Sequence, residues 1–296
     1  MKNAICYLNG RYLPVRDATI SATDRGFLFG EGLFETWKTY RGRPFAVREH
    51  LARMAKSARA IGIDFDAAEN WAARTEQLAK RNHMTDQGGA VRFTITRGSG
   101  EVSLVPPKLV KPTRLMLFRP LEPGLLEARR RGVSVHLMDF GSGVSPAFRN
   151  LKTLNYLPAV RGKLEARRGG AFESLYRLAD DTILEGTTSN FFVLRKGRLI
   201  TTPVTTGILP GVTRSLVIKL ACKVVEVEER RIDTDDLRRA SEIFLTSSTI
   251  EIVPVVKIDR HAVAGGSPGE LTGLLQQRYR AMVARRVHLP ASELGI

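Results

Sequence analysis

The chain has 296 residues, of which 43% are hydrophobic and 26% are charged, and 46 Lys and Arg against 30 Asp and Glu give a formal net charge of +16. This length is typical of about two domains of roughly 150 residues each, which can fold without disulfides. The two cysteines and the scattered histidines exclude a disulfide framework and a thiolate zinc site, so we expect no metal. Apolar runs are far shorter than the ~20 residues of a membrane span, and the N-terminus lacks a secretory apolar stretch. We therefore expect a cytoplasmic protein that does not bind membranes.

The N-terminal part predicts a β-hairpin, because Asn9-Gly10 separates two short alternating stretches. Apolar residues at helical spacing predict a helix over 48–61, which Gly62 ends, and a second over 66–81 with Asp66 as its N-cap. Further strands are expected at 33–40, 43–47, 90–98 and 113–121, and a loop at 17–32. Two prolines and a glycine mark residues 119–128 as a linker between an N-terminal domain (1–118) and a C-terminal domain (129–296).

The C-terminal part mixes strands and helices without a strict βαβ rhythm. Strands are expected at 132–140, 174–180, 191–197, 198–203, 224–232, 242–248 and 251–259, and helices at 156–168, 213–221, 233–240 and 271–286. This pattern predicts an α+β or mixed α/β architecture in two lobes.

Two segments contain candidate catalytic residues. In NLKTLNY, apolar leucines flank Lys152, and a lysine in a partly apolar pocket has a lowered pKa and can form a Schiff base; the same pattern also fits a surface lysine. In LEGTTSNFF, Glu185 follows apolar residues at a strand end, so a half-buried carboxylate with a cationic partner is expected.

Two other segments are rich in groups that bind anions. GILPGVTR leads through Val212 and Thr213 into a helix, whose first N–H groups favour a phosphate. LTSSTIEIVPV places Ser248 and Thr249 in a hydroxyl-rich break between two strands, where they could donate further hydrogen bonds to a phosphate.

In this order, the four segments resemble the fold-type IV enzymes that use pyridoxal 5′-phosphate (PLP), namely the class IV aminotransferases and the related aminodeoxychorismate lyases. The N-terminal segment DRGFLFGEGLFETWKTYRGRPFAVREHLARM is also similar to that family, and the resemblance is greatest to D-amino-acid aminotransferases. It implies a PLP-dependent transaminase with a two-lobed fold, a ping-pong mechanism and a homodimeric assembly.

The resemblance also implies a role for each matching position. Lys152 would hold PLP and shuttle a proton, and Glu185 would keep the pyridine nitrogen protonated, so that the ring acts as an electron sink. Tyr156 stands where branched-chain enzymes place a tyrosine near the ring oxygen, with one residue less between it and the lysine. The phosphate would be bound by Arg53, Val212, Thr213, Ser248 and Thr249.

The residues expected to bind the substrate carboxylate depart from both known patterns. D-alanine-type enzymes place an arginine and a histidine two residues apart after TRG, but Val102 and Leu104 stand there in this chain. Branched-chain enzymes place an arginine in the FE-x-x-R strand, where Lys38 stands here, and a lysine is not a planar bidentate donor.

Two arginines of the expected strand at 90–98 are further candidates. Branched-chain enzymes also have an arginine at the position of Arg92. Arg92 and Arg97 fall on opposite faces of the strand by period-two alternation, so at most one of them faces the site. We expect Phe34, Lys38 and Arg92 near the substrate.

Two alternatives are weighed against the transaminase. An aminodeoxychorismate lyase, which forms 4-aminobenzoate and pyruvate, shares the scaffold and Lys152, although EGTTSN and SSTIEIVPV are more similar to aminotransferases. The +16 charge would suit a nucleic-acid-binding protein, but the sequence has no zinc finger, aromatic RNA-binding strand or recognition helix. We therefore expect amino acid and 2-oxo acid substrates and no nucleic-acid partner.

Overall fold

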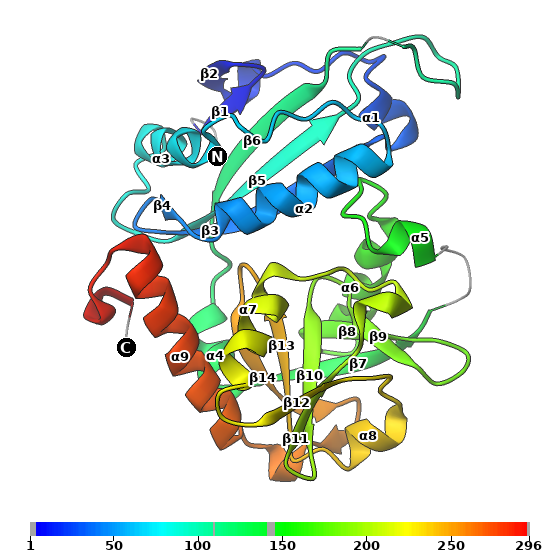
Figure 1. Ribbon diagram of the computed structural model, residues 1–296, viewed down its shortest axis with the longest axis vertical. Helices are drawn as coiled ribbons and strands as arrows, with labels where there is room; N and C mark the ends of the chain where they lie inside the picture. Colours follow the sequence, from blue (N-terminus) through cyan, green and yellow to red (C-terminus); the bar gives the residue numbers. More distant parts are fainter. Residues whose placement is uncertain (1–3, 109, 141–145, 295–296) are drawn as a thin grey trace. The chain divides into compact units, whose positions relative to one another are not determined.

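The computed structural model describes residues 4–108, 110–140 and 146–294. The chain forms two compact units (Figure 1), the first made of Met1–Leu121 with Leu151–Asn155 and the second of Glu122–Asn150 with Tyr156–Ile296. The chain passes from the first unit to the second inside the range 119–128, and the short segment that carries Lys152 packs with the first unit.

The first unit is built on a six-stranded antiparallel sheet in the order β2-β1-β6-β5-β3-β4. Its longest helix, α2, packs against β3, as Figure 1 shows. The strands are β1 (Ile5–Leu8), β2 (Arg11–Pro14), β3 (Gly32–Tyr40), β4 (Arg43–Pro44), β5 (Gly89–Thr96) and β6 (Thr113–Pro120), and the helices are η1 (Val15–Asp17), α1 (Arg25–Phe29), α2 (Val47–Ala60) and α3 (Trp71–Arg81).

The core of the first unit lies on the face of the sheet that α2 covers. Trp37, Phe93 and Met116 come from three adjacent strands, and Met54 of α2 and Trp71 of α3 pack with them. Because side chains alternate along a strand, the neighbouring even-numbered residues of β3 and β5 point to the opposite face, where the candidate site residues Phe34, Lys38 and Arg92 lie.

Most predicted elements of the first unit are confirmed, including the Asn9-Gly10 hairpin, with three differences. The strand expected at 43–47 is shorter, because β4 covers only Arg43–Pro44 and α2 begins at Val47. The predicted N-cap Asp66 is wrong: α3 begins at Trp71, and Asn70 caps it by accepting from the N–H of Ala73. The Asp66 carboxylate instead accepts from the N–H of Ala68 in a local turn. Such local hydrogen bonds of aspartate compete with its role as a helix N-cap. The expected loop at 17–32 contains helix α1.

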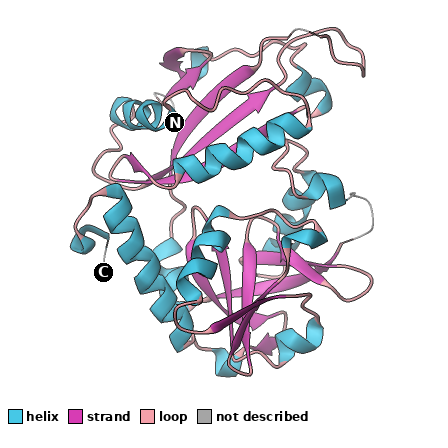
Figure 2. Cartoon of the chain, in the orientation of Figure 1, coloured by secondary structure: helices cyan, strands magenta, loops and turns pink. Residues whose placement is uncertain are grey.

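The second unit is built on a nine-stranded mixed sheet in the order β12-β11-β10-β13-β14-β7-β8-β9, with β15 paired to β14. The mixed α/β architecture expected from the sequence is confirmed (Figure 2). The strands are β7 (Val133–Asp139), β8 (Glu173–Arg177), β9 (Ile183–Gly186), β10 (Asn190–Arg195), β11 (Arg198–Thr201), β12 (Glu226–Glu229), β13 (Glu242–Ser247), β14 (Glu251–Ile258) and β15 (His261–Ala262).

The helices of the second unit include three that border the candidate site, α4, α7 and α9. Short helices α4 and α5 were not expected, whereas α6, α7, α8 and α9 match predicted helices, and Asp233 caps α8 through a capping box. The helices are α4 (Leu125–Arg131), α5 (Pro146–Arg149), α6 (Leu157–Arg168), η2 (Val204–Thr206), α7 (Val212–Ala221), α8 (Thr234–Arg238), η3 (Ala264–Gly266), α9 (Glu270–Val287) and η4 (Ala291–Leu294). In the described part of the chain, no helix has the length and apolarity to span a membrane.

Candidate active site

Lys152 lies on a short segment that pairs with the beginning of β3. The N–H of Phe34 donates to the carbonyl of Lys152 at 2.9 Å, and the N–H of Leu154 donates to the carbonyl of Gly32 at 3.0 Å. A Cβ on Gly32 would come within 2.6 Å of the Leu154 side chain. The glycine therefore allows the close approach that fixes the backbone of Lys152 against the strand.

The ring of Phe34 brings two cations together. The Nζ of Lys152 lies 4.5 Å from the ring centroid, and the Cζ of Arg92 lies 3.5 Å from it. Such contacts are attractive because the face of an aromatic ring is electronegative. One aromatic side chain is thus contacted by both an amine and a guanidinium.

The two strand arginines contact different groups. Arg92 lies opposite Thr36 in the register of β3 and β5, on the face with Phe34. Arg97 donates to Glu31 and to the carbonyls of Ile61 and Gly62 at the end of α2. The predicted separation of the two arginines is therefore observed.

Lys38 shares the Phe34 face but contacts a different ring. It is buried, and its Nζ lies 4.5 Å from the centroid of Tyr40. The two lysines of this face, Lys38 and Lys152, are thus each held over their own aromatic side chain.

On the opposite face of β3, Glu35 forms a buried ion-pair network with α2. The side chain of Arg53 donates twice to the Glu35 carboxylate, from Nε at 2.7 Å and from Nη2 at 2.6 Å, and Nδ1 of His50 lies 2.7 Å from Oε2. Burial alone would raise the pKa of Glu35, but the charge and hydrogen bonds of Arg53, with those of His50, lower it to about 2. Burial lowers the pKa of His50, and the charge of Lys152 adds to this.

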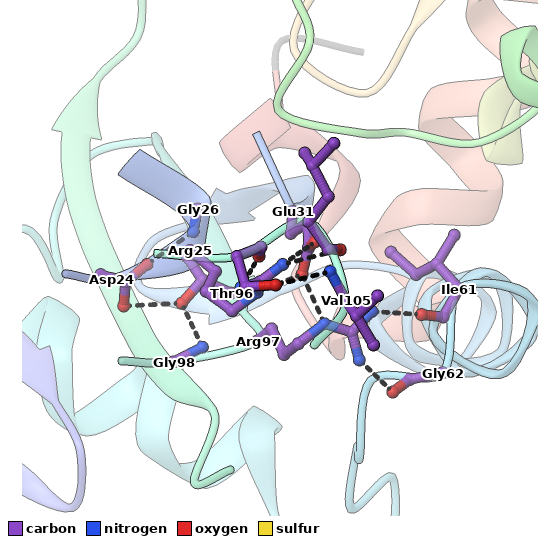
Figure 3. Close-up of polar contacts among 12 residues, drawn as sticks. Asp24, Arg25, Gly26, Glu31, Ile61, Gly62, Thr96, Arg97, Gly98 and Val105 are labelled. Atoms are coloured by element: carbon purple, nitrogen blue, oxygen red, sulfur yellow. Dashed lines mark hydrogen bonds and ion pairs between the residues drawn. The ribbon is translucent and has the colours of Figure 1, made fainter. Parts of the chain in front are cut away.

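A second buried network, missed by the sequence interpretation, fixes the loop that follows β5 (Figure 3). Arg25 is 0% exposed and donates to both oxygens of Glu31, at 2.9 and 2.7 Å. Its guanidinium also donates to the carbonyls of Glu101, Ser103 and Leu104 at 3.1, 2.6 and 3.3 Å. Glu31 in turn accepts from Arg97, so one carboxylate joins two arginines.

This loop presents apolar side chains where D-alanine-type enzymes are expected to have an arginine and a histidine. Val102 is 74% exposed and Leu104 is 81% exposed. Neither side chain can form a hydrogen bond to a carboxylate.

In the second unit, Glu185 lies at the end of β9 and is half-buried. Its carboxylate accepts from Nδ2 of Asn190 at 3.0 Å and from the N–H of Leu209 at 3.1 and 3.2 Å. Asn190 also donates to the carbonyl of Leu209 at 3.0 Å. Asn190 is therefore the side chain that orients Glu185.

The turn between Glu185 and Asn190 is held by a second carboxylate that the sequence interpretation missed. Glu173 is fully buried in β8 and accepts from the hydroxyls of Thr187, Thr188 and Ser189. Lys163 of α6 lies 3.2 Å from it. These bonds fix the turn that leads from Glu185 to Asn190.

Helix α7 begins close to the same group. Its N-cap is Gly211, and a Cβ there would come within 1.9 Å of Oδ1 of Asn190. Among the described residues, none caps this helix through its side chain, and its first turn contains no acidic residue. The first N–H groups of α7, at Val212 and Thr213, therefore suit an anion.

Ser248 and Thr249 lie at the same end of the sheet as Asn190. They belong to the turn that joins β13 to β14, and Asn190 is paired with Thr246 near the end of β13. Tyr156 precedes α6 and acts electrostatically on Tyr176. Burial raises the pKa of Tyr176, and the charges of Glu173 and Glu185 raise it further.

The predicted site residues therefore form two groups, one in each unit. The first unit brings together Lys152, Phe34 and Arg92, with Lys38 on the same face and Arg53 on the other. The second unit places Glu185, Val212, Thr213, Ser248 and Thr249 at one end of its sheet. Within the described residues, no cluster of three or more His, Cys, Asp or Glu side chains could hold a metal ion.

Comparison with known proteins identifies the family. The model of the family described as "Amino-transferase class IV" matches residues 32–258. The chain belongs to the class IV aminotransferases, and it is therefore a PLP-dependent enzyme with the fold of the type IV PLP enzymes.

Relatives with several activities cover nearly the whole chain. A putative branched-chain-amino-acid aminotransferase of Methanocaldococcus jannaschii is 36% identical, over 93% of this chain and 94% of the relative. An aminodeoxychorismate lyase of Bacillus subtilis is 32% identical, over 95% and 96%. A D-alanine aminotransferase of Bacillus licheniformis is 33% identical, over 90% and 93%.

Solved structures with a similar fold also include both aminotransferases and a lyase. The branched-chain amino acid aminotransferase of Escherichia coli superposes with a TM-score of 0.87 at 26% identity, covering 95% of both chains. A PLP-bound hypothetical aminotransferase from Mycobacterium tuberculosis gives 0.84 at 24% identity, covering 96% of this chain and 100% of the other. The 4-amino-4-deoxychorismate lyase of Pseudomonas aeruginosa gives 0.79 at 29% identity, covering 93% and 98%.

The groups present match the chemistry of PLP. An amine can attach the aldehyde, a half-buried carboxylate suits a protonated pyridine nitrogen, and a helix N-terminus suits the phosphate. The first unit contains such an amine in Lys152, and the second unit contains such a carboxylate in Glu185 and such a helix N-terminus in α7.

Proposed function

We propose that this enzyme is a transaminase that moves an amino group between an amino acid and a 2-oxo acid in two half-reactions with ping-pong kinetics. The observation that carries the proposal is the ring of Phe34, over which the amine of Lys152 and the guanidinium of Arg92 both lie. A transaminase needs a nucleophilic amine close to a group that binds the substrate carboxylate. Lys152 and Arg92 supply these two functions.

Two residues of the chain carry out the chemistry. When bound, PLP withdraws electrons from the α-carbon of the substrate. Lys152 would hold the cofactor through its side-chain amine, and the same Nζ would take the proton from the substrate α-carbon. Glu185, oriented by Asn190 and Leu209, keeps the pyridine nitrogen protonated, because its carboxylate stabilises the positive charge there.

The remaining cofactor contacts follow from the positions of charged and hydroxyl groups. The two bonds between Glu35 and Arg53 fix the orientation of the guanidinium, which binds the phosphate as a planar donor. We propose that Tyr156 contacts the ring oxygen of PLP. The other contacts to the phosphate are assigned to Val212, Thr213, Ser248 and Thr249.

We propose amino donors of the branched-chain type ahead of D-amino acids. Phe34, Lys38 and Arg92 lie on one face of the first sheet and supply an aromatic wall and two cations. Val102 and Leu104 cannot act as the arginine and histidine of D-alanine-type enzymes. The likeness to the putative branched-chain enzyme of M. jannaschii supports the same choice.

Single-turnover spectra with separate amino donors test this proposal. With L-leucine or L-glutamate we expect loss of the yellow cofactor absorbance and release of one equivalent of 2-oxo acid. The same change with D-alanine or D-glutamate alone would favour the D-amino-acid class. No conversion with any donor would contradict the transaminase.

The alternative function is an aminodeoxychorismate lyase. The relative in B. subtilis supports it, and Lys152 and Glu185 would serve it equally. Formation of pyruvate and 4-aminobenzoate from aminodeoxychorismate, without conversion of the cofactor by amino donors, would establish the lyase instead.

We further infer a cytoplasmic homodimer. Phe27 of α1 and the loop residues Val102, Leu104 and Val105 are exposed apolar side chains, which a second copy would remove from water. Cys6 and Cys222 are both free thiols, as in a reducing compartment. Light scattering of the wild type and of Val105→Asp tests the assembly, and a wild-type monomer would contradict it.

A further inference from the structure

The turn that carries Ser248 and Thr249 has an unusual backbone. Ser247 pairs with Glu251 across β13 and β14, so residues 248–250 form a three-residue hairpin loop. The residue that follows this loop lies in the left-handed region, which favours glycine. Here that residue is Glu251, with φ 61°, and it is only 3% exposed.

A glutamate at this position is unfavourable in two ways. The left-handed region is disfavoured for a residue that has a Cβ, and a buried carboxylate needs compensating charges. Two arginines supply them: Nε of Arg129 lies 3.6 Å and Nε of Arg280 lies 3.4 Å from Oε2 of Glu251. The ion pairs offset the cost and hold the backbone in this conformation.

Arg129 also binds the turn itself. From α4, its Nε donates to the carbonyl of Ile250 at 3.0 Å and its Nη2 to the carbonyl of Thr249 at 3.3 Å. One guanidinium therefore contacts two carbonyls of the turn and the carboxylate that follows it.

Helix α9 connects this turn to the start of α7. Nε2 of Gln276 donates to the carbonyls of Arg129 and Ile252 at 3.0 and 3.1 Å. One turn further along α9, a side-chain hydrogen bond joins Tyr279 to Thr213. The helix, labelled in Figure 1, packs against both α7 and β14.

We propose that Arg129 and Glu251 are positioning residues for the phosphate site. They fix turn 248–250 so that the Ser248 and Thr249 hydroxyls and the first N–H groups of α7 meet the same phosphate. This inference rests on the proposed function, because that function assigns the phosphate to these groups.

The test compares PLP with pyridoxal, which has the same ring and aldehyde but no phosphate. Dissociation constants are measured for the full-length protein freed of cofactor, in the wild type, Arg129→Met and Arg129→Lys. We expect Arg129→Met to weaken PLP binding about 10-fold or more, the effect of misplacing a charge-assisted hydrogen bond, and to leave pyridoxal binding within about twofold. Arg129→Lys keeps the charge but not the planar donor, so we expect an intermediate loss.

A control and a spectroscopic measurement separate positioning from loss of folding. Arg130 is an exposed residue of the same helix and forms an ion pair with Glu127, so Arg130→Met should bind both ligands as the wild type does. The ³¹P resonance of bound PLP should shift toward that of free PLP in Arg129→Lys but not in Arg130→Met.

The outcomes distinguish this inference from the proposed function. If the wild type prefers PLP and both Arg129 variants keep the wild-type ratio of affinities and the wild-type ³¹P resonance, Arg129 does not position the phosphate site. If the wild type binds PLP and pyridoxal equally, the phosphate assignment of the proposed function fails.

Discussion

The amine of Lys152 lies over the ring of Phe34, with Nζ 4.5 Å from the centroid, while the Phe34 N–H donates to the Lys152 carbonyl. Both ends of the lysine are thus held by the same residue of β3. A fixed backbone with the amine against an aromatic ring is the arrangement expected of a reactive lysine, because positioning lowers the entropic cost of reaction.

Replacement of Lys152 should therefore abolish the covalent attachment of the cofactor. We expect Lys152→Ala and Lys152→Arg to lose the yellow absorbance and more than about 1000-fold in kcat, since neither side chain provides a nucleophilic amine. Borohydride treatment followed by peptide mass analysis measures the attachment, with Lys80→Ala, an exposed lysine of α3, as the control. Retention of the cofactor on another lysine in Lys152→Ala, with turnover, would refute the assignment.

Arg92 should determine substrate affinity with little effect on the cofactor. We expect Arg92→Leu to raise the KM for amino donor and 2-oxo acid about 10- to 100-fold, the effect of losing one hydrogen-bonded charge pair, and to leave the cofactor spectrum unchanged. Steady-state kinetics measure this, with the exposed Arg59→Leu as control. A fall in kcat at unchanged KM would show that Arg92 does not bind the substrate.

The sequence predicts local elements well and long-range contacts poorly. The Asn9-Gly10 hairpin, helix α6 and helix α9 follow from turn residues and helical periodicity, which neighbouring residues determine. The start of α3 was misplaced because Asp66 and Asn70 both have capping side chains, and only packing of Trp71 in the core distinguishes between them.

The same limit applies to the site. The Lys152 and Glu185 motifs could be found because each is carried by a short segment. The role of Arg25 could not be found in this way, because its partners are carbonyls of a loop distant in sequence. Every residue has a backbone carbonyl, so the sequence does not indicate which carbonyls accept hydrogen bonds. Arg129 binds turn 248–250 in the same way.

Glu35 predicts how stability depends on pH. Its pKa is about 2 in the folded protein against an ordinary value of 4.5. A lowered carboxyl pKa gives stability that is present above pH 4.5 and is lost as the pH falls from 4.5 toward 2, here about 3 kcal/mol. The lowered pKa of His50 acts in the same direction, because unfolding at acidic pH lets its ring bind a proton.

Urea unfolding at a series of pH values measures this effect. We expect Glu35→Gln to unfold at lower urea concentration at pH 7 and to lose stability less steeply below pH 4.5 than the wild type does. Glu127→Gln is the control for loss of a more exposed carboxylate. Equal slopes for Glu35→Gln and the wild type would contradict the role given to Glu35.

Gly211 tests the connection between Glu185 and helix α7. A Cβ at this position would come within 1.9 Å of Oδ1 of Asn190, so Gly211→Ala must displace either the asparagine or the start of the helix. Because Asn190 orients Glu185, we expect weaker cofactor binding, lower kcat and a loss of about 1–3 kcal/mol of stability from overpacking. Gly273→Ala in α9 is the matched control: nothing lies within 4 Å of its added Cβ, and alanine should stabilise the helix by up to about 1 kcal/mol. Thermal unfolding and PLP titration of both variants measure these effects, and wild-type cofactor binding by Gly211→Ala would show that Asn190 and α7 can shift without disturbing Glu185.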